Sequence, residues 1–219
     1  ILVLLSGGAS ALLCQFDPSL TLLQVQQLNE VLLQSGASID EINTIRKKIS
    51  TIKGGQLSSY IHQYYHQPLY SFIMSDVIGD PLDIIASGPT VRNNNTQQDV
   101  LQILEKYPLI TTTVAQQVLK VLHSPPPNNS IIPHNTQAAD QHILIANNTL
   151  ALRCAAETAR LLDYDVIIKT MTLEGEAQEV AQDICQDVLI LQPKITKATC
   201  LLYGGETTVT LSKEHGLGG

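Results

Sequence analysis

The sequence lacks three features that would each define a class of protein. It has no run approaching the roughly 18 consecutive apolar residues that a membrane-spanning helix requires. It has no basic cluster, since 13 Lys and Arg stand against 20 Asp and Glu and give a net charge of −7, which argues against a nucleic-acid-binding surface. It also has no CxxC pair. These absences predict a globular protein with neither a membrane nor a nucleic acid as partner.

Cysteine and histidine are too isolated to suggest a metal centre. His62 and His66 share a helix face, but no acid lies between them in an HExxH pattern, which argues against zinc. The cysteines stand apart in apolar contexts, so we expect reduced core residues of a cytoplasmic protein. They are Cys14, Cys154, Cys185 and Cys200.

The chain begins without Met and ends in the glycine-rich residues 216–219, so we expect an internal segment of a longer protein, whose targeting cannot be judged.

Apolar runs and helical periodicities alternate along all 219 residues. This alternation predicts an α/β fold, with a mostly parallel sheet and helices on both faces. Strands are expected at residues 1–5, 69–74, 143–146, 166–168, 199–203 and 207–211, the last two forming a hairpin. Helices are expected at about 21–35, 38–48, 56–65, 96–106, 113–122, 149–162 and 175–191. The unbroken run Ile1–Leu5 is typical of a strand covered on both faces, and the proline-rich residues 124–130 predict a surface connection.

The most distinctive stretch is the acidic segment that follows the strand at 69–74. Asp76, Asp80 and Asp83 crowd into eight residues at the end of a strand, where open α/β sheets bind ligands. Such a density of like charge opposes folding unless a cation, a hydrogen-bond donor or water compensates it. A divalent metal that carries phosphate is one interpretation, and a solvated acidic turn with local backbone hydrogen bonds is the other.

Two Gly-Gly turns are candidates for anion binding. In Ser6–Ser10, glycines between a strand and a helix would let a phosphate or carboxylate approach free N–H groups at the helix start. Lys53 precedes Gly54 and Gly55, where a second helix is expected to begin, so a point charge and two N–H groups would meet there. The alternatives are a tight βα turn for the first site and a solvated surface lysine for the second.

Two further strand ends carry polar residues, namely Asn147–Asn148 and Gly204–Thr207. Either one alone is explained by turn formation. The carboxyl ends of parallel strands share one edge of a sheet, however, so we expect both to converge with Ser6–Ser10 and Ser75–Asp80 on one crevice.

Four segments together resemble the glycerate 2-kinase family: LLSGGASALL, IRKKISTIKGGQL, SDVIGDPLDIIASGPTV and LYGGETTVTL, in family order. The resemblance implies a Rossmann-like glycerate kinase N-terminal domain at residues 1–193, lacking its first part. It also implies the truncated beginning of a smaller α/β domain, called MOFRL, at 194–219, with a site in the cleft between the domains. The implied reaction is ATP-dependent phosphorylation of D-glycerate to 2-phosphoglycerate with Mg²⁺. A family segment containing an active-site lysine and an Arg-Asn continuation are absent, so we expect residues 1–219 alone to be inactive.

The resemblance, together with the needs of phosphoryl transfer, suggests roles for individual residues. Lys53 and Asp76 are the predicted catalytic residues, and Asp76, Asp80 and Glu206 are the predicted Mg²⁺ ligands. The predicted substrate- and phosphate-binding residues are Ser6, Gly7, Gly8, Ser10, Gly54, Gly55, Ser87, Gly88, Thr90, Asn147, Asn148, Gly204, Gly205 and Thr207.

Two other functions compete with the kinase. Family members are sometimes labelled hydroxypyruvate reductases, but Ser6–Ala11 lacks the GxGxxG spacing of a dinucleotide site. A non-catalytic phosphate- or carboxylate-binding module would explain the first glycine turn but would leave the acidic segment without a purpose. The partners expected are glycerate and a nucleotide, and the sequence leaves a homodimer open.

Overall fold

The computed structural model describes residues 1–107, 109, 111–123 and 140–210. The predicted connection at 124–130, the last residue of the predicted strand 207–211 and the glycine-rich residues 216–219 lie outside the described residues. The chain separates into two compact units, Ile1–Ile145 and Ala146–Gly219.

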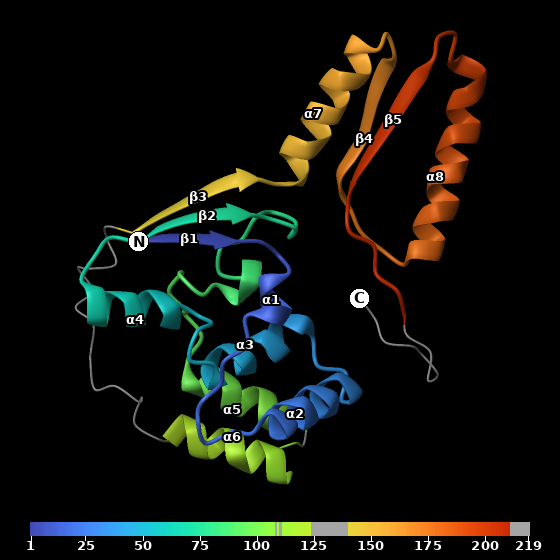
Figure 1. The fold of residues 1–219 in the computed structure, drawn as a ribbon. Coiled ribbons are helices and arrows are strands. Elements are labelled where there is room, and N and C mark those ends of the chain that lie inside the picture. The colour runs from blue at the N-terminus through green and yellow to red at the C-terminus, as the bar shows by residue number, and fades with distance from the viewer. Residues whose placement is uncertain (108, 110, 124–139, 211–219) are drawn as a thin grey trace. The chain divides into compact units, whose positions relative to one another are not determined.

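The first unit is a three-stranded sheet with a helical layer (Figure 1). The strands follow the order β1-β2-β3, and β1 and β2 are parallel, with Leu2 paired with Tyr70 and Leu5 paired with Ile73. Its described elements are β1 (Leu2–Leu5), α1 (Ala9–Leu12), α2 (Leu22–Gln34), α3 (Ile39–Ile49), α4 (Gln56–Tyr65), β2 (Tyr70–Met74), the 3₁₀ turn η1 (Ile85–Ser87), α5 (Gln97–Lys106), α6 (Thr113–His123) and β3 (Gln141–Ala146), which ends at the boundary.

Capping residues set the starts of α3 and α5. The Ser38 hydroxyl accepts from Glu41 N–H at 3.3 Å, and the Glu41 carboxylate accepts from Ser38 N–H at 2.9 Å, which completes a capping box at α3. Thr96 and Asp99 form the same reciprocal pair at α5. Two of the four orphan N–H groups at each helix start are thereby satisfied, which fixes where the helix begins.

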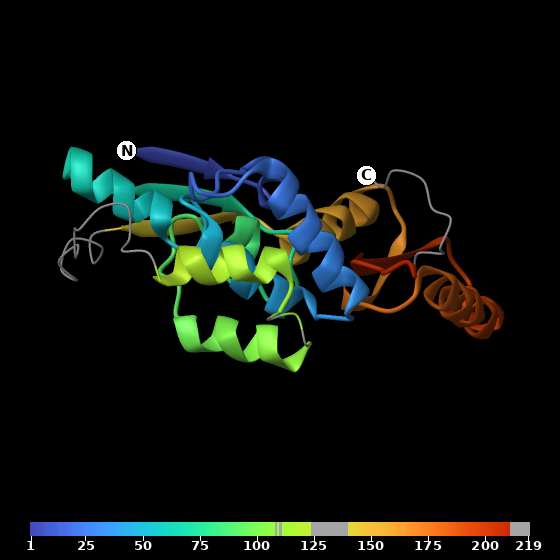
Figure 2. The ribbon, with the colours of Figure 1, turned by 90° about the horizontal axis from the view of Figure 1, so that it is seen from below.

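The helices of the first unit share a core of their own. Buried aliphatic residues of α2, α3, α5 and α6 pack together, among them Leu32, Ile45, Leu104 and Val118. A smaller cluster joins the sheet to the η1 turn through Leu5, Ile73, Ile85 and Ala86. In Figures 1 and 2, α5 and α6 lie side by side in the helical layer on one side of the sheet.

The other face of this sheet is uncovered among the described residues. Leu2 is 69% exposed and Leu4 is 78% exposed, whereas Leu5 is buried against the helical side. Because side chains alternate along a strand, these values place Leu2 and Leu4 on the open face. The expectation that Ile1–Leu5 is covered on both faces is therefore wrong for the part of the chain that the structure describes.

The second unit contains α7 (Asn148–Leu161), β4 (Asp165–Leu173), α8 (Ala177–Leu191), the 3₁₀ turn η3 (Gln192–Lys194) and β5 (Thr199–Gly205). β4 and β5 pair in parallel, and α7 and α8 lie on opposite sides of this two-stranded sheet (Figure 1). The parallel strands and helices of the two units confirm the α/β fold class.

The predicted hairpin at 199–211 is wrong. β5 continues through Gly204 and Gly205 instead of turning, because its partner is β4, and Thr208 then bridges to Glu176 in parallel. This pairing also joins residues on either side of the predicted domain boundary at 193. The division into domains 1–193 and 194–219 stays a prediction about the family's domains, whereas the compact units meet at residue 146.

The cysteines are not in the core. Cys14, Cys154 and Cys185 are exposed and Cys200 is half-buried, all with free thiols. For Cys154 on α7 and Cys185 on α8 the reason is that an apolar neighbourhood in sequence does not fix which helix face a residue occupies. Of the helices described, none has both the length and the apolar character needed to cross a bilayer.

Candidate active site

The turn between β1 and α1 carries the first candidate residues. Ala9 N–H donates to Ser6 O and Ser10 N–H donates to Gly7 O, both at 3.0 Å, which folds the turn tightly. Among the described residues, the N–H groups of Gly7 and Gly8 donate to no backbone oxygen. The turn therefore offers two N–H groups to a ligand, although α1 is only one helical turn long and adds little dipole.

Asp76 lies directly against this turn. A Cβ added to Gly7 would overlap the Asp76 carboxylate, so the absence of a side chain at Gly7 is what lets the carboxylate approach. Asp76 is exposed, and no hydrogen-bond or ion-pair partner for it is found in the described part of the chain. The first glycine turn and the first acid of the acidic segment thus form one surface.

A second segment, Ser87–Thr90, closes on the turn from another side. The hydroxyl oxygens of Ser10 and Ser87 are 3.0 Å apart, and the Lys53 ammonium donates to Ser10 O at 2.6 Å. Lys53 is only 2% exposed, and its burial lowers the pKa of the ammonium group. Lys53 therefore lies beneath the turn and holds Ser10 in place.

The predicted anion site at Gly54 and Gly55 is corrected by the structure. Gly54 N–H donates to Ser87 O at 2.9 Å, and Gly55 N–H donates to Gly88 O at 2.8 Å. These N–H groups at the start of α4 are therefore occupied by carbonyls of the chain itself. The predicted ligand residues Gly54 and Gly55 are therefore bound to Ser87 and Gly88, two other residues predicted to bind a ligand.

Thr90 also has an internal partner. It is 3% exposed, and its hydroxyl accepts a hydrogen bond from Ser71 at 3.0 Å. Gly88 has a left-handed backbone, and a Cβ there would lie 2.7 Å from Asp83 O. Of the predicted ligand residues in this segment, Ser87 is the one whose side chain faces the β1–α1 turn.

The three acids of the acidic segment have different surroundings. Asp83 lies 3.5 Å from the Lys47 ammonium, so a lysine compensates part of the negative charge. Asp80 is half-buried with a left-handed backbone, at φ 54°. Of the residues described, none gather into a group of three His, Cys, Asp or Glu side chains that could hold a metal. Mg²⁺ usually takes one or two protein carboxylates and keeps several waters, which the exposed carboxylate of Asp76 fits.

The second unit brings together the remaining predicted residues. Asn147 caps α7 by accepting from Leu150 N–H at 2.8 Å, and the Asn148 amide donates to Met171 O at 2.6 Å. A Cβ on Gly204 would overlap Leu152 and crowd Asn148, so Gly204 is needed for helix–strand packing. Glu206 and Thr207 are exposed beyond β5. Convergence of these residues with those of the first unit stays a prediction.

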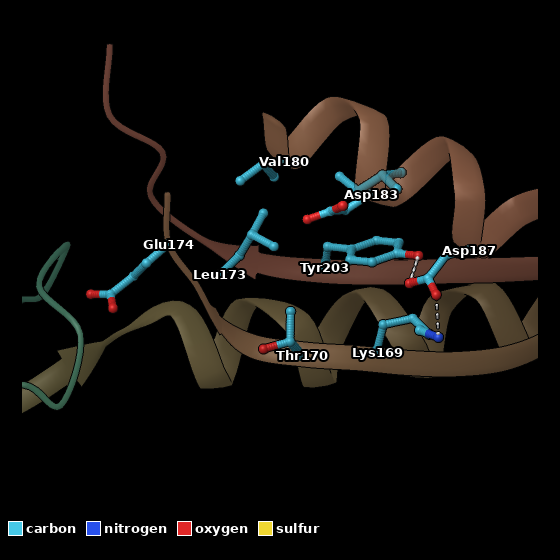
Figure 3. A pocket seen from close by; sticks show the side chains of 9 residues that line it. Lys169, Thr170, Leu173, Glu174, Val180, Asp183, Asp187 and Tyr203 are labelled. Carbon is cyan, nitrogen blue, oxygen red and sulfur yellow. Dashed lines mark hydrogen bonds and ion pairs between the residues drawn. The ribbon is translucent and has the colours of Figure 1, made fainter. Parts of the chain in front are cut away.

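A pocket in the second unit was missed by the sequence reasoning (Figure 3). Asp187 on α8 accepts from the Lys169 ammonium and from the Tyr203 hydroxyl, each at 3.0 Å. These hydrogen bonds lower the pKa of Asp187, whereas burial, followed by the bond to Asp187, raises the pKa of Tyr203. The three residues come from three elements and form no sequence motif, so no local pattern could have revealed them.

The first unit thus belongs to a recognisable class of protein. It is an α/β protein that presents a serine- and glycine-rich turn and an exposed carboxylate beyond adjacent parallel strands, where such sheets bind ligands.

Comparison with known proteins identifies the family. The family described as "Domain of unknown function (DUF4147)" matches residues 1–123, more than half of the chain, so the chain belongs to this family. The resemblance to glycerate 2-kinases is confirmed by curated relatives. A glycerate 2-kinase of Pyrococcus horikoshii is 35% identical over 237 residues, covering 100% of this chain and 50% of its own length. A glycerate kinase of Rattus norvegicus is 40% identical over 182 residues, covering 83% and 34% respectively.

Solved structures agree with this assignment. A crystal structure of glycerate kinase from Thermotoga maritima matches with a TM-score of 0.75 and 33% identity, covering 100% of this chain and 50% of that one. A Pyrococcus horikoshii structure matches over the same shares with a TM-score of 0.68 and 34% identity. The chain spans about half the length of both Pyrococcus horikoshii proteins and of the Thermotoga maritima structure, and about a third of the rat protein.

Proposed function

We propose that the complete protein containing this chain transfers the γ-phosphoryl group of ATP to the 2-hydroxyl group of D-glycerate. The observation that carries the proposal is the similarity along the whole chain to proteins named glycerate 2-kinase and D-glycerate 2-kinase. Because the chain spans half of these relatives, the activity belongs to the complete protein, and residues 1–219 alone are expected to be inactive.

The reaction needs no reactant other than glycerate and ATP. The glycerate hydroxyl oxygen forms a bond to the γ-phosphorus, the bond to the bridging β–γ oxygen breaks, and the hydroxyl proton is released. In such a transfer the protein mainly positions the reactants and stabilises charge. ATP and Mg²⁺ are the proposed cofactors, and Mg²⁺, when bound, neutralises charge on the phosphate oxygens.

The geometry supports specific roles in this reaction. We assign binding of the glycerate carboxylate or a nucleotide phosphate to the N–H groups of Gly7 and Gly8, with Ser6 exposed beside them. Asp76 would hold Mg²⁺, because its exposed carboxylate lies at the same turn. Asp80 and Glu206 remain proposed further ligands.

The role proposed for Lys53 differs from the one predicted from the sequence. Its ammonium already donates to Ser10 O and is shielded from solvent, so we assign it to positioning of the β1–α1 turn in place of direct charge neutralisation. Gly54 and Gly55 support the Ser87–Gly88 segment through their N–H groups. A cytoplasmic location and a homodimer are retained as parts of the proposal.

The decisive experiment offers the complete protein D-glycerate, ATP and Mg²⁺ and couples the product to enolase. Enolase consumes 2-phosphoglycerate directly, so a signal without added phosphoglycerate mutase identifies the 2-phosphate, and a signal that needs the mutase identifies the 3-phosphate. The Mg²⁺ requirement is tested without enolase, by separating the phosphoglycerate and ADP formed in the absence and presence of a chelator, which should abolish product formation. Asp76→Asn should lower turnover by about 100-fold or more. Wild-type turnover in Asp76→Asn would remove Asp76 from the chemistry.

A parallel reaction tests the alternative. Hydroxypyruvate and a reduced nicotinamide cofactor are supplied to the same preparation, and cofactor oxidation is followed. Reaction in this mixture alone would replace the kinase by an oxidoreductase. Magnesium-independent binding of a sugar phosphate, with no turnover in either mixture, would favour a non-catalytic module.

A further inference from the structure

The Ser87–Thr90 segment has an unusual backbone. Ala86, Ser87 and Gly88 are consecutive residues with left-handed conformations, at φ 55°, 62° and 59°. Non-glycine residues disfavour this conformation, so two adjacent ones persist only where the surroundings hold them. Such strain concentrates at functional sites, and here it places the Ser87 hydroxyl 3.0 Å from that of Ser10.

Four successive carbonyl groups of this segment are bound from outside it. The first three accept hydrogen bonds from the start of α4: Ser87 O from Gly54 N–H, Gly88 O from Gly55 N–H, and Pro89 O from Ser58 N–H at 3.3 Å. The fourth, Thr90 O, lies 3.1 Å from Nε2 of His142 on β3. The segment is therefore held between α4 and β3, which lie far apart in the sequence.

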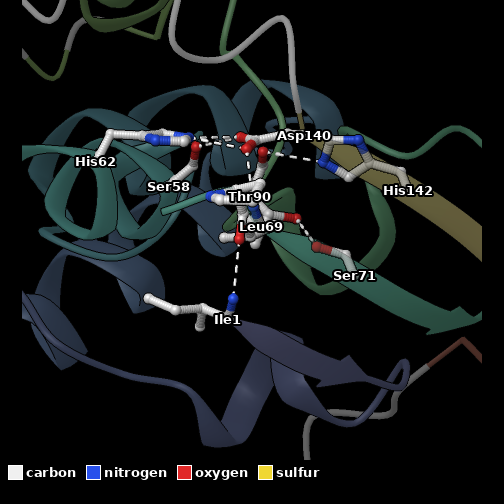
Figure 4. A network of polar contacts seen from close by, with 9 residues as sticks. Ile1, Ser58, His62, Leu69, Ser71, Thr90, Asp140 and His142 are labelled. Carbon is white, nitrogen blue, oxygen red and sulfur yellow. Dashed lines mark hydrogen bonds and ion pairs between the residues drawn. The ribbon is translucent and has the colours of Figure 1, made fainter. Parts of the chain in front are cut away.

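A buried carboxylate joins α4 to the beginning of β3 (Figure 4). Asp140 accepts from the Ser58 hydroxyl at 2.9 Å, from His62 Nε2 at 2.8 Å and from Leu69 N–H at 3.2 Å. The side chains of His62 and Asp140 are both 3% exposed. Both carboxylate oxygens accept hydrogen bonds. Loss of the Asp140 carboxylate would remove the partner of the buried His62 Nε2 and Ser58 hydroxyl, and a buried polar group without a partner is destabilising.

This cluster does not form a nucleophilic triad, despite its composition. The Ser58 hydroxyl bonds to Asp140 and not to His62, so no base is placed to activate it. Ser58 is also only 1% exposed, out of reach of a substrate. The arrangement suits a clamp, formed by Asp140 with Ser58 and His62, that fixes α4 to the beginning of β3.

We propose that Asp140, His62 and His142 are positioning residues that hold the strained Ser87–Thr90 segment in place and thereby keep Ser87 against Ser10 in the active site. The inference rests on the proposed kinase function. Asp140 fixes α4, and the N–H groups of Ser58 in α4 and of the two glycines directly before it bind three of the carbonyls. His142, two residues after Asp140, binds the fourth. None of these side chains touches the β1–α1 turn, so they act through the segment that they hold.

The test compares matched substitutions of His142 in the complete protein. His142→Leu removes the donor to Thr90 O, whereas His142→Gln keeps an N–H donor at about the same reach. We expect His142→Leu to lower kcat per folded molecule by between about 10- and 100-fold, and His142→Gln to restore most of it. Val118→Ala serves as the control, because it creates a cavity in the helical core, away from the clamp. It should lower the melting temperature without changing kcat per folded molecule.

Amide hydrogen exchange gives a readout that does not depend on activity. In His142→Leu and in Asp140→Asn, exchange at Gly54, Gly55 and Ser58 should accelerate by about tenfold or more relative to wild type, because their acceptors are released. Unchanged exchange at these three amides overturns the clamp. If exchange accelerates while kcat of the folded fraction equals that of an active wild type, the positioning role is overturned. An inactive wild type overturns the proposed kinase function instead, and the exchange data still decide the clamp.

Discussion

The two Gly-Gly turns of the first unit resemble each other in sequence and differ in almost every physical respect. Gly7 and Gly8 open a helix of one turn, and their N–H groups meet no backbone oxygen among the described residues. Gly54 and Gly55 have left-handed backbones, precede the ten-residue helix α4, and donate to Ser87 and Gly88 carbonyls. The first turn is open to a ligand, and the second is filled by another segment of the same chain.

This difference shows that a glycine-rich helix start is not by itself an anion site. Both the dipole and the free N–H groups favour any acceptor, whether a phosphate or a carbonyl of the protein. At α4 the acceptor is a strained segment that begins about 30 residues later, so the helix start stabilises the site without touching a ligand. Substitutions in each turn separately test whether the two turns differ in this way.

The largest effect is expected from Gly7→Ala. Its Cβ would overlap the Asp76 carboxylate, so Asp76 must move away from the turn and phosphorylation of glycerate should fall by about 100-fold or more. Gly8→Ala is the matched variant, because its backbone is right-handed at φ −55° and no atom lies within 4 Å of the added Cβ. It should keep the fold and lose much less activity. Equal losses in the two variants, measured as kcat in the enolase-coupled assay, would contradict the close approach of Asp76.

A substitution in the second turn should lower the free energy of unfolding. Gly55→Ala meets both a left-handed backbone at φ 81° and the Val91 carbonyl at 2.9 Å, so we expect a loss of about 2–4 kcal/mol in the free energy of unfolding. Gly36→Ala has a similar φ of 78° with open space around the Cβ, so it isolates the backbone term at about 1 kcal/mol. Urea denaturation measures both. A loss for Gly55→Ala no greater than that for Gly36→Ala would mean that the contact with Val91 relaxes freely.

Local patterns predicted the elements well, because their causes are local. The capping boxes at Ser38 and Thr96 and the helical periodicity of α2 and α6 place helices within a residue or two of their observed bounds. The failures are non-local. The hairpin after Tyr203 was expected from its glycines, but the pairing partner of β5 is β4, about 30 residues earlier.

The candidate site shows the same limit. Asp76 and the Ser6–Ser10 turn were both recognised, since each follows a strand, but their contact depends on β1 and β2 being neighbours in the sheet. The clamp at Asp140 was missed altogether. His62 and Ser58 lie four residues apart on one face of α4, which could have signalled a shared partner, yet nothing in the sequence points to an aspartate about 80 residues later.

The smallest effect is expected from substitution of Glu41, at the junction of α3 and α5. This residue supports the helical layer electrostatically and belongs to neither turn. The ammonium of Lys106, followed by the hydroxyl of Tyr107, lowers the pKa of Glu41 from its ordinary 4.5 to about 2. Because the folded pKa is depressed, the stability that Glu41 contributes is fully present above pH 4.5 and is lost as the pH falls towards 2. Glu41→Gln should therefore destabilise the protein at neutral pH, and its difference from wild type should shrink through this window. Lys106→Met should reproduce part of the change, because it removes the strongest cause of the shift. Urea denaturation from pH 6 to pH 3 measures the difference, and a difference that stays constant with pH would show that the charge of the Glu41 carboxylate contributes nothing to stability.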